Sequence, residues 1–293
     1  MRIPRNPFPL FAAVLLWTLS ALAASPNTGT WTATAREDTL NLSFRFEERS
    51  QMGITVPRSA FQGLNTADGA NTKFQLVREA GTLNFEGRFS GGEGAGHYQF
   101  APNAAYLQEM AKLGYTEISL LEQFQFAIFD VGPARVKALA ELGYTKLSDD
   151  QLLQVAIFQV TPEHIRAMRA AGYDKLTMDE LVASRIHGVT PEHIRELAGL
   201  GYRKLSFDEL LSTRIHRITP QFISEAKGLG LGELSLEDLM TMRIHRVTPE
   251  YVREIREAGY PDVTLKQLVE MRIHAIDADY VRSLSRNKNT RGK

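Results

Sequence analysis

The chain has 293 residues, which is long enough for two domains, and its 34 basic and 34 acidic residues give a formal net charge of +0. This balance gives no global bias toward nucleic acid, so we expect no nucleic-acid partner. Because there is no cysteine, disulfides, thiol catalysis, cysteine-ligated zinc and a cysteine-linked lipid anchor are excluded.

Residues 1–23 have the pattern of a secretory signal peptide. Arg2 and Arg5 precede an apolar run from about Pro9 to Leu22, and Ala21-Leu22-Ala23 resembles a cleavage site. The alternative is an uncleaved anchor, but a membrane span needs about 20 apolar residues and this run is shorter. No later segment is apolar enough to cross a bilayer. The sequence therefore predicts a periplasmic or secreted protein with no stable membrane span after cleavage, and residues 24–29 as a linker.

Residues 30–100 are predicted to form a small antiparallel β domain, either a sheet or an open barrel. Leu40, Leu42 and Phe44 alternate with polar residues, the period of a half-buried strand. Because about 70 residues give only a marginal core, we expect the first repeats to cover one face. The strand candidates are 30–36, 39–47, 52–56, 72–79, 82–89 and 95–100, with a hairpin turn at 79–81 and a looser connection at 63–71.

Residues 91–96 (Gly-Gly-Glu-Gly-Ala-Gly) could suggest a phosphate-binding loop. Such a loop needs a helix N-terminus directly after it, whereas His97-Tyr98-Gln99-Phe100 has the character of a strand. The segment also lacks the Gly-Lys-Ser/Thr ending. We therefore expect a hairpin turn here, and we interpret His97 as a strand residue.

The organising feature of residues 101–281 is a unit that recurs every 29 residues without insertion or deletion. Such self-similarity indicates a helical repeat array. Six full units are followed by a truncated one at Asp277, and the full units begin at Asn103, Gly132, Thr161, Thr190, Thr219 and Thr248.

Each unit is predicted to contain two short helices. Thr-Pro starts the first helix in four units, and a glycine at a fixed position ends it. Ser or Thr, followed three residues later by Glu, Gln or Asp, predicts a capping box at the start of the second. Because short helices are marginal alone, stacking must bury their apolar columns, including Ile128, Ile157, Ile186, Ile215, Ile244 and Ile273. The fold class is therefore α+β: a small antiparallel β domain followed by an αα-solenoid of six repeats.

Arg-Ile-His segments near the end of the second helix are the most suggestive candidates for a site. Four histidines in register suggest a metal ladder, but successive layers lie roughly 10 Å apart, whereas zinc ligands lie about 2 Å from the metal. Phe129 and Phe158 occupy the same position in the first two units. We therefore expect a packing or capping position, no metal site and no cofactor. The segments contribute Arg185, His187, Arg214, His216, Arg243, His245, Arg272 and His274.

The four arginines allow two interpretations. The first is structural: each pairs with carboxylates of a neighbouring unit, such as the column containing Asp179 and Asp208. The second is functional: they form a cationic stripe that contacts an anionic partner. We favour the first and keep all eight Arg and His residues as candidate partner-binding residues. His164 and His193 align with Tyr106, Phe222 and Tyr251, which indicates an amphipathic packing position.

Residues 282–293 form a basic tail that we expect to be disordered. It contains Arg282, Arg286, Lys288, Arg291 and Lys293. A solvated end is the simpler interpretation, and attachment to an acidic surface is the alternative.

The repeats resemble those of exported bacterial proteins, in their Thr-Pro-Glu-x-Ile/Val-Arg, Leu/Ala-Gly-Tyr and Arg-Ile-His-Gly-Val segments. Similar arrays occur as C-terminal extensions of membrane metallopeptidases of the beta-lactam-sensor type. The peptidase's zinc motif and membrane helices are absent from this sequence, so the resemblance implies an envelope location and an accessory binding role, without protease activity.

The sequence thus predicts a non-enzymatic envelope protein that acts as a protein-interaction or scaffold module, with an envelope or extracellular protein as its partner. The alternative is a sensor or carrier of a small ligand, with a pocket between the β domain and the first repeats. Phe124, Phe126, Phe129 and Phe158 favour an apolar interface there, or a cavity if they enclose one. A hydrolase would need clustered His and Asp residues with perturbed pKa values.

Overall fold

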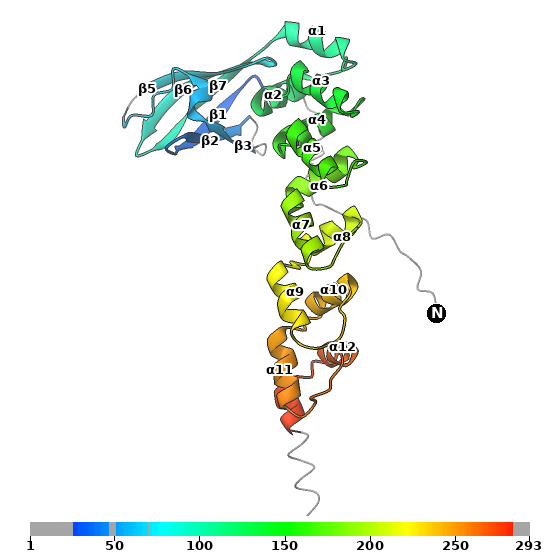
Figure 1. The fold of residues 1–293 in the computed structure, drawn as a ribbon. Helices are drawn as coiled ribbons and strands as arrows, with labels where there is room; N and C mark the ends of the chain where they lie inside the picture. Colours follow the sequence, from blue (N-terminus) through cyan, green and yellow to red (C-terminus); the bar gives the residue numbers. More distant parts are fainter. Residues whose placement is uncertain (1–25, 47–50, 70, 284–293) are drawn as a thin grey trace, which may run out of the picture. The chain divides into compact units, whose positions relative to one another are not determined.

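The structure is a computed structural model that describes residues 26–46, 51–69 and 71–283 (Figure 1). The predicted signal peptide (1–23) and residues 284–293 of the predicted basic tail lie outside the described residues. The chain forms two compact units, which we describe separately. Of the described residues, the first contains those up to Gln108 and residues 116–130, and the second contains residues 109–115 and 131–283.

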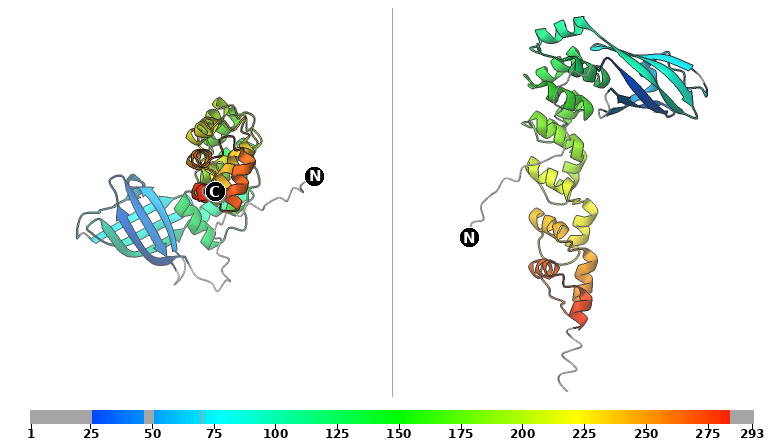
Figure 2. Two further views of the ribbon diagram at one scale, coloured as in Figure 1. Left: turned by 90° about the horizontal axis from the view of Figure 1, so that it is seen from below. Right: turned by 180° about the vertical axis from the view of Figure 1, so that it is seen from behind.

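The first unit is built on a curled seven-stranded antiparallel sheet with the strand order β3-β2-β1-β7-β6-β5-β4 (Figures 1 and 2). The predicted antiparallel sheet is therefore confirmed. The strands are β1 (Thr28–Ala35), β2 (Thr39–Arg45), β3 (Gln51–Pro57), β4 (Phe61–Gln62), β5 (Asn71–Arg78), β6 (Gly81–Ser90) and β7 (Glu93–Pro102), with a short 3-10 helix at Arg58–Ala60.

Two details of the sheet differ from the prediction. β1 begins at Thr28, inside the predicted linker, and β4 has only two residues, too few to produce an alternating pattern in the sequence. The glycine-rich segment forms the expected hairpin: Gly91 and Gly92 make the turn with φ of 58° and 81°, and Gly94 and Gly96 continue into β7.

Trp31 is the centre of the sheet's apolar face. Its indole N–H lies 3.0 Å from the His97 carbonyl, and its ring is 1% exposed. Gly87 and Gly96 face each other across β6 and β7, and a Cβ on Gly87 would lie 2.7 Å from the Trp31 ring. Glycine at these positions therefore lets the strands approach closely enough for the indole to be buried.

The second helix of the first repeat belongs to this unit. α1 spans Ala104–Lys112 and α2 spans Leu120–Phe129. The Phe124 ring of α2 is fully buried, with the centroids of Phe44, Tyr98 and Phe100 5.4–6.0 Å away. α2 therefore covers part of the apolar face of the sheet, as predicted for the first repeats. Phe124 makes this contact by packing among the aromatic side chains of the sheet.

Gln123 of α2 occupies a position where the other five units carry leucine. Its side-chain amide donates to the carbonyls of Ala80 (2.7 Å) and Asn103 (3.0 Å), and it is 2% exposed. Those carbonyls belong to the β5–β6 turn and to the residue before α1. A leucine would leave them without this donor, so the exception to the repeat is explained by the sheet.

The second unit is made of helix pairs whose first residues recur every 29 positions. First helices are α3 (Pro133–Glu141), α5 (Pro162–Ala170), α7 (Pro191–Gly199), α9 (Pro220–Lys227) and α11 (Pro249–Glu257). Second helices are α4 (Asp149–Ile157), α6 (Met178–His187), α8 (Phe207–Ile215), α10 (Leu236–Ile244) and α12 (Leu265–Ile273). Residues 278–283 are also helical. Within this unit, α8, α10 and α12 follow one another along one side and α7, α9 and α11 along the other (Figures 1 and 2).

The caps predicted from the sequence are present. A full capping box starts α2, α4, α6, α8, α10 and α12, and a threonine caps α5, α7, α9 and α11 with proline at the first turn. The glycines predicted to end the first helices have positive φ, from 63° to 123°. Local sequence therefore fixes where each helix begins and where the chain turns.

Consecutive repeats are tied together by side chains that donate to backbone carbonyls of the neighbouring repeat. The hydroxyls of Tyr144, Tyr173 and Tyr202 each donate at 2.7 Å to a carbonyl in the next unit, that of Leu176, Leu205 or Leu234. In the opposite direction, Arg169, Lys227 and Arg256 donate to the carbonyls of Leu142, Leu200 and Leu229. The basic side chains use carbonyls at or just after the end of a first helix, which have no partner within that helix, and the tyrosines use the carbonyl just before the N-cap of a second helix. Both kinds of bond set the register between neighbouring repeats.

One predicted core column is wrong. Ile128, in the first repeat, is buried. The equivalent isoleucines of the other five repeats are 39–59% exposed: Ile157, Ile186, Ile215, Ile244 and Ile273. The valine or isoleucine three positions later is buried instead in Val160, Val189, Ile218 and Val247. The helix ends at the isoleucine, or one residue later in α6, and the chain turns back, which directs the later side chain inward.

Replacing Gln123 by leucine, the residue of the other repeats, should destabilise the protein by about 1–3 kcal/mol, because two carbonyls lose a buried donor. Urea unfolding of Gln123→Leu measures this. The reverse change at the aligned position, Leu152→Gln, should also destabilise, since Leu152 is fully buried. A Gln123→Leu protein that is more stable than the parent would contradict this account.

Candidate interaction surface

The arginines of the Arg-Ile-His segments lie in the last turns of α6, α8, α10 and α12. The Nε groups of Arg185, Arg214 and Arg272 donate to carbonyls of the preceding unit, those of Phe158 (3.0 Å), His187 (3.2 Å) and Arg246 (3.0 Å). These bonds tie the end of one second helix to the end of the next. The structural interpretation is thus correct that the arginines bridge neighbouring units, but wrong about the acceptor, which is a backbone carbonyl. The Asp179 carboxylate instead accepts from Gln151 at 2.9 Å.

Arg243 departs from this pattern. Its Nε is buried and has no hydrogen-bond partner among the described residues. Its guanidinium lies over the Phe222 ring at 3.8 Å, as that of Arg272 lies over Tyr251 at 3.7 Å. Burial lowers the pKa of Arg243, and the positive charge of Arg217 lowers it further, while Glu225 opposes the shift. The guanidinium is held by an aromatic face in place of an acceptor.

The exposed isoleucines form a series along the same helix ends, which we call the isoleucine row: Ile157, Ile186, Ile215, Ile244 and Ile273. Their exposed fractions are 40%, 39%, 46%, 57% and 59% in chain order. Neighbouring second helices contact one another, α4 with α6, α6 with α8, α8 with α10 and α10 with α12. The row is therefore a repeated apolar feature on one series of adjacent helices.

Positive charge accompanies the row. The residue two positions after each isoleucine adopts a left-handed conformation, and it is arginine in two units, Arg217 (φ 54°) and Arg246 (φ 55°). Both are exposed. The helix ends at 214–217 and 243–246 thus carry two arginines each, whereas those at 185–188 and 272–275 carry one and that at 156–159 carries none.

The histidines of the same segments lie beside the isoleucines. His187 is the last residue of α6, and His216, His245 and His274 are C-cap residues of α8, α10 and α12. The first three are half-buried and His274 is exposed. These positions suit the negative end of each helix, as the sequence predicts.

The sequence prediction missed two histidine–hydroxyl pairs. His164 Nε2 lies 2.7 Å from Ser184 Oγ, and His193 Nε2 lies 2.7 Å from Thr213 Oγ1. In other units the serine or threonine position carries Val155, Met242 or Met271. The sequence does contain a signal for these pairs. A position that is apolar in the other repeats is serine or threonine in the two repeats whose first helix has histidine at the aligned position.

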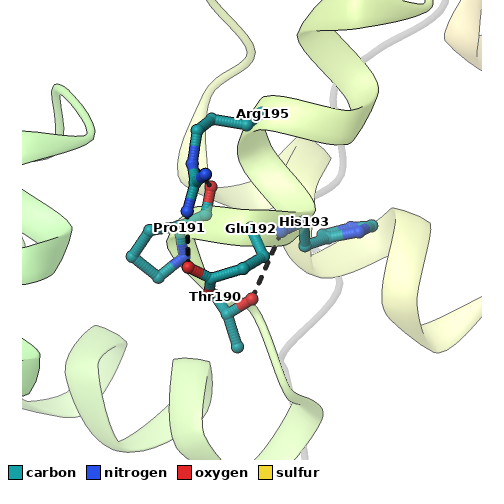
Figure 3. A network of polar contacts seen from close by, with 5 residues as sticks. All are labelled: Thr190, Pro191, Glu192, His193 and Arg195. Carbon is teal, nitrogen blue, oxygen red and sulfur yellow. Dashed lines mark hydrogen bonds and ion pairs between the residues drawn. The ribbon is translucent and has the colours of Figure 1, made fainter.

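The geometry of these pairs defines which atom donates. The hydroxyls of Ser184 and Thr213 donate at 2.6 Å to the carbonyls of Leu181 and Leu210 in their own helices. Each hydroxyl oxygen therefore accepts from the imidazole Nε2–H, and the histidine cannot deprotonate it. His193 is 3% exposed, and Figure 3 shows its ring pointing away from the Glu192–Arg195 ion pair. The pairs join the two helices of a unit.

A second candidate site lies on the outer face of β5, β6 and β7. It is a depression of about 530 Å³ with polar side chains from Lys73, Gln75, Asn84, Glu86 and His97. Lys73 pairs with Glu86 at 3.1 Å, and Gln75 donates to Asn84 at 2.7 Å. Because these groups pair across strands, their arrangement is that of ordinary cross-strand contacts.

Two kinds of site are absent from the part of the chain that the structure describes. No group of three or more His, Asp or Glu side chains is placed to hold a metal ion. Among the same residues, no helix has the length and apolar character needed to traverse a bilayer.

Comparisons of the chain with protein-family models, with curated proteins and with solved structures find no match. The resemblance of the repeats to the extensions of beta-lactam-sensor peptidases therefore stays an expectation from sequence.

Replacing His193 and Thr213 by the residues of the next unit, His193→Phe with Thr213→Met, should weaken the pH dependence of stability. Burial and Arg214 lower the pKa of His193, and Glu196 opposes the shift. The unfolded histidine, with a pKa of about 6.5, takes up its proton first as pH falls. Stability is therefore complete above pH 6.5 and declines as the pH falls toward the folded pKa.

Urea unfolding at pH 7.5 and 5.5 tests this expectation. The double variant should lose less stability than the parent between the two pH values. His164→Phe with Ser184→Met is the matched comparison, because burial also lowers the pKa of His164. An unchanged pH dependence in both variants would show that the buried imidazoles do not carry it.

Proposed function

We propose that this protein is an exported, non-enzymatic repeat protein that serves as a protein-interaction or scaffold module in the bacterial envelope. Its 29-residue units would stack as an αα-solenoid of six repeats. The signal-peptide pattern of residues 1–23 and the resemblance of the repeats support the location. Repeat arrays commonly bind other proteins through their extended surfaces.

The observation that carries the proposal is the isoleucine row. By contrast, the leucines five positions before four of these isoleucines, Leu181, Leu210, Leu239 and Leu268, are 0–1% exposed. The row repeats one large apolar side chain in water at five equivalent positions, with arginine beside the last four. Single exposed apolar residues are ordinary, but a regular series of them on adjacent helices is typical of an interaction surface.

The aromatic cluster of the first unit weighs against the alternative of a small-ligand carrier. The Phe124 ring stacks against Tyr98 at 5.6 Å and lies edge-on to Phe44, Phe46 and Phe100. Side chains therefore occupy the space between α2 and the apolar face of the sheet. Phe124, one of the four phenylalanines that the carrier hypothesis names, is thus packed among aromatic rings of the sheet.

The histidine–hydroxyl pairs are the closest approach to a catalytic arrangement, and they support a non-enzymatic role. Ser184 and Thr213 are 1% and 0% exposed, and their protons go to carbonyls of their own helices. A nucleophile needs an adjacent base that accepts its proton and access to substrate. Neither condition is met by these hydroxyls.

A capture experiment from bacterial envelope extract tests the proposal. The purified chain should retain specific proteins, and the variant Ile215→Ser/Ile244→Ser/Ile273→Ser should lose them, because the apolar contact is removed. The matched control is Val77→Ser/Leu121→Ser/Tyr260→Ser, which alters three side chains that are 42%, 41% and 47% exposed outside the row. Circular dichroism establishes that all three proteins are folded.

Retention of the same proteins by the parent and by the isoleucine variant would place binding elsewhere on the molecule. Retention of nothing by the parent would remove the support for an interaction role and favour a search for bound small molecules.

A further inference from the structure

The isoleucine row has a defined spacing. Second helices of consecutive units are in contact, and arginine side chains bond the end of one to the end of the next, Arg185 to Phe158, Arg214 to His187 and Arg272 to Arg246. Packed helices lie about 8–10 Å apart. The isoleucines at these linked ends therefore recur about every 10 Å.

This spacing indicates which secondary structure a partner segment needs in order to contact several isoleucines of the row at once. An α-helix rises about 1.5 Å per residue, so residues seven apart lie on one face at intervals of about 10.5 Å. In a strand, residues on one face are separated by multiples of about 6.8 Å, which gives 6.8 or 13.6 Å. A helix with an apolar residue at every seventh position therefore matches the row, and a strand does not.

The positive charges beside the row indicate the charge that a bound partner segment should carry. Arg217 and Arg246 are exposed, flank Ile215 and Ile244, and have no side-chain hydrogen bond or ion pair among the described residues. Arg217 lies close enough to Arg243 for the two positive charges to interact unfavourably, while Glu225 offsets part of this. Carboxylates on a partner would relieve that repulsion, and a basic partner would increase it.

We propose that Ile215, Ile244 and Ile273, together with Arg217 and Arg246, dock an acidic amphipathic helix of a partner protein with apolar residues at seven-residue intervals. The proposal rests on the proposed interaction function and specifies the partner. The apolar residues of the helix lie on the isoleucines, and its carboxylates face the arginines. The partner helix is recognised through its apolar face, and charge sets specificity.

Fluorescence anisotropy with a labelled synthetic peptide tests the proposal on the full chain. The probe is a 28-residue peptide with leucine at every seventh position, glutamate beside each leucine and alanine elsewhere. Two control peptides have the same length: one carries lysine in place of glutamate, and one carries its leucines five residues apart. We expect binding of the first peptide only, weakening as salt is raised.

Protein variants locate the binding. Arg217→Glu/Arg246→Glu should weaken binding about tenfold or more, since two attractive contacts become repulsive. The matched control Arg195→Glu/Arg253→Glu makes the same charge change on α7 and α11, where both arginines pair with glutamates, and should bind like the parent. Ile215→Ser/Ile244→Ser should also bind about tenfold or more weakly.

Several outcomes would overturn the proposal: equal binding of the lysine peptide, equal binding of the peptide with the altered spacing, or no difference between the two pairs of arginine variants. Binding to phosphatidylglycerol vesicles without binding to the peptide would assign the surface to a membrane instead. If the peptide fails but extract capture still depends on the isoleucines, the interaction function stands and the acidic-helix partner is wrong.

Discussion

The structure of the second unit depends on the carbonyls that short helices leave unsatisfied at their ends. Each helix has about ten residues or fewer, so unpaired terminal groups are a large fraction of its backbone. Basic side chains 27 residues further along the chain supply donors to such carbonyls, exemplified by Arg256 to Leu229, and tyrosine hydroxyls bond in the other direction to the carbonyl just before a second helix, exemplified by Tyr173 to Leu205. Each of these bonds joins two neighbouring repeats. These ties fix the register, and the register decides which side chains face water.

That register explains both the regular and the exceptional positions. Leucines of the second helices are buried wherever the neighbour is another helix pair, and Gln123 replaces one where the neighbour is the β5–β6 turn with its carbonyl. The isoleucine row is the other consequence. The arginine that directly precedes Ile186, Ile215 or Ile273 donates to a carbonyl of the previous repeat. The isoleucine itself is left in solvent. Arg185, Arg214 and Arg272, which the sequence offered as binding residues, therefore also link neighbouring repeats, and the exposed Arg217 and Arg246 add positive charge beside the row.

Local signals in the sequence predicted most of the fold, because caps and turns depend on residues within a few positions of each other. The six capping boxes and the alternating strands are of this kind. The failures concern which face of an element is buried. A fixed period identified Ile186 and its equivalents as a repeated column, but period alone does not distinguish a core column from a surface one when the helix ends at that residue. The His193–Thr213 pair needed two positions 20 residues apart to be compared unit by unit, and the two-residue β4 gave no pattern at all.

The central claim is that the isoleucine row is free for binding and does not hold the fold together. The most direct measurement is the free energy of unfolding of Ile215→Ser/Ile244→Ser/Ile273→Ser, compared with Ile223→Ser, whose side chain is fully buried. Exposed substitutions usually change stability by less than about 0.5 kcal/mol each, so the triple variant should stay within about 1.5 kcal/mol of the parent. The single variant at Ile223 should lose more than about 2 kcal/mol, since it removes core packing and buries a hydroxyl. A triple variant that loses as much as Ile223→Ser would mean that the row is part of the core, and would contradict the account.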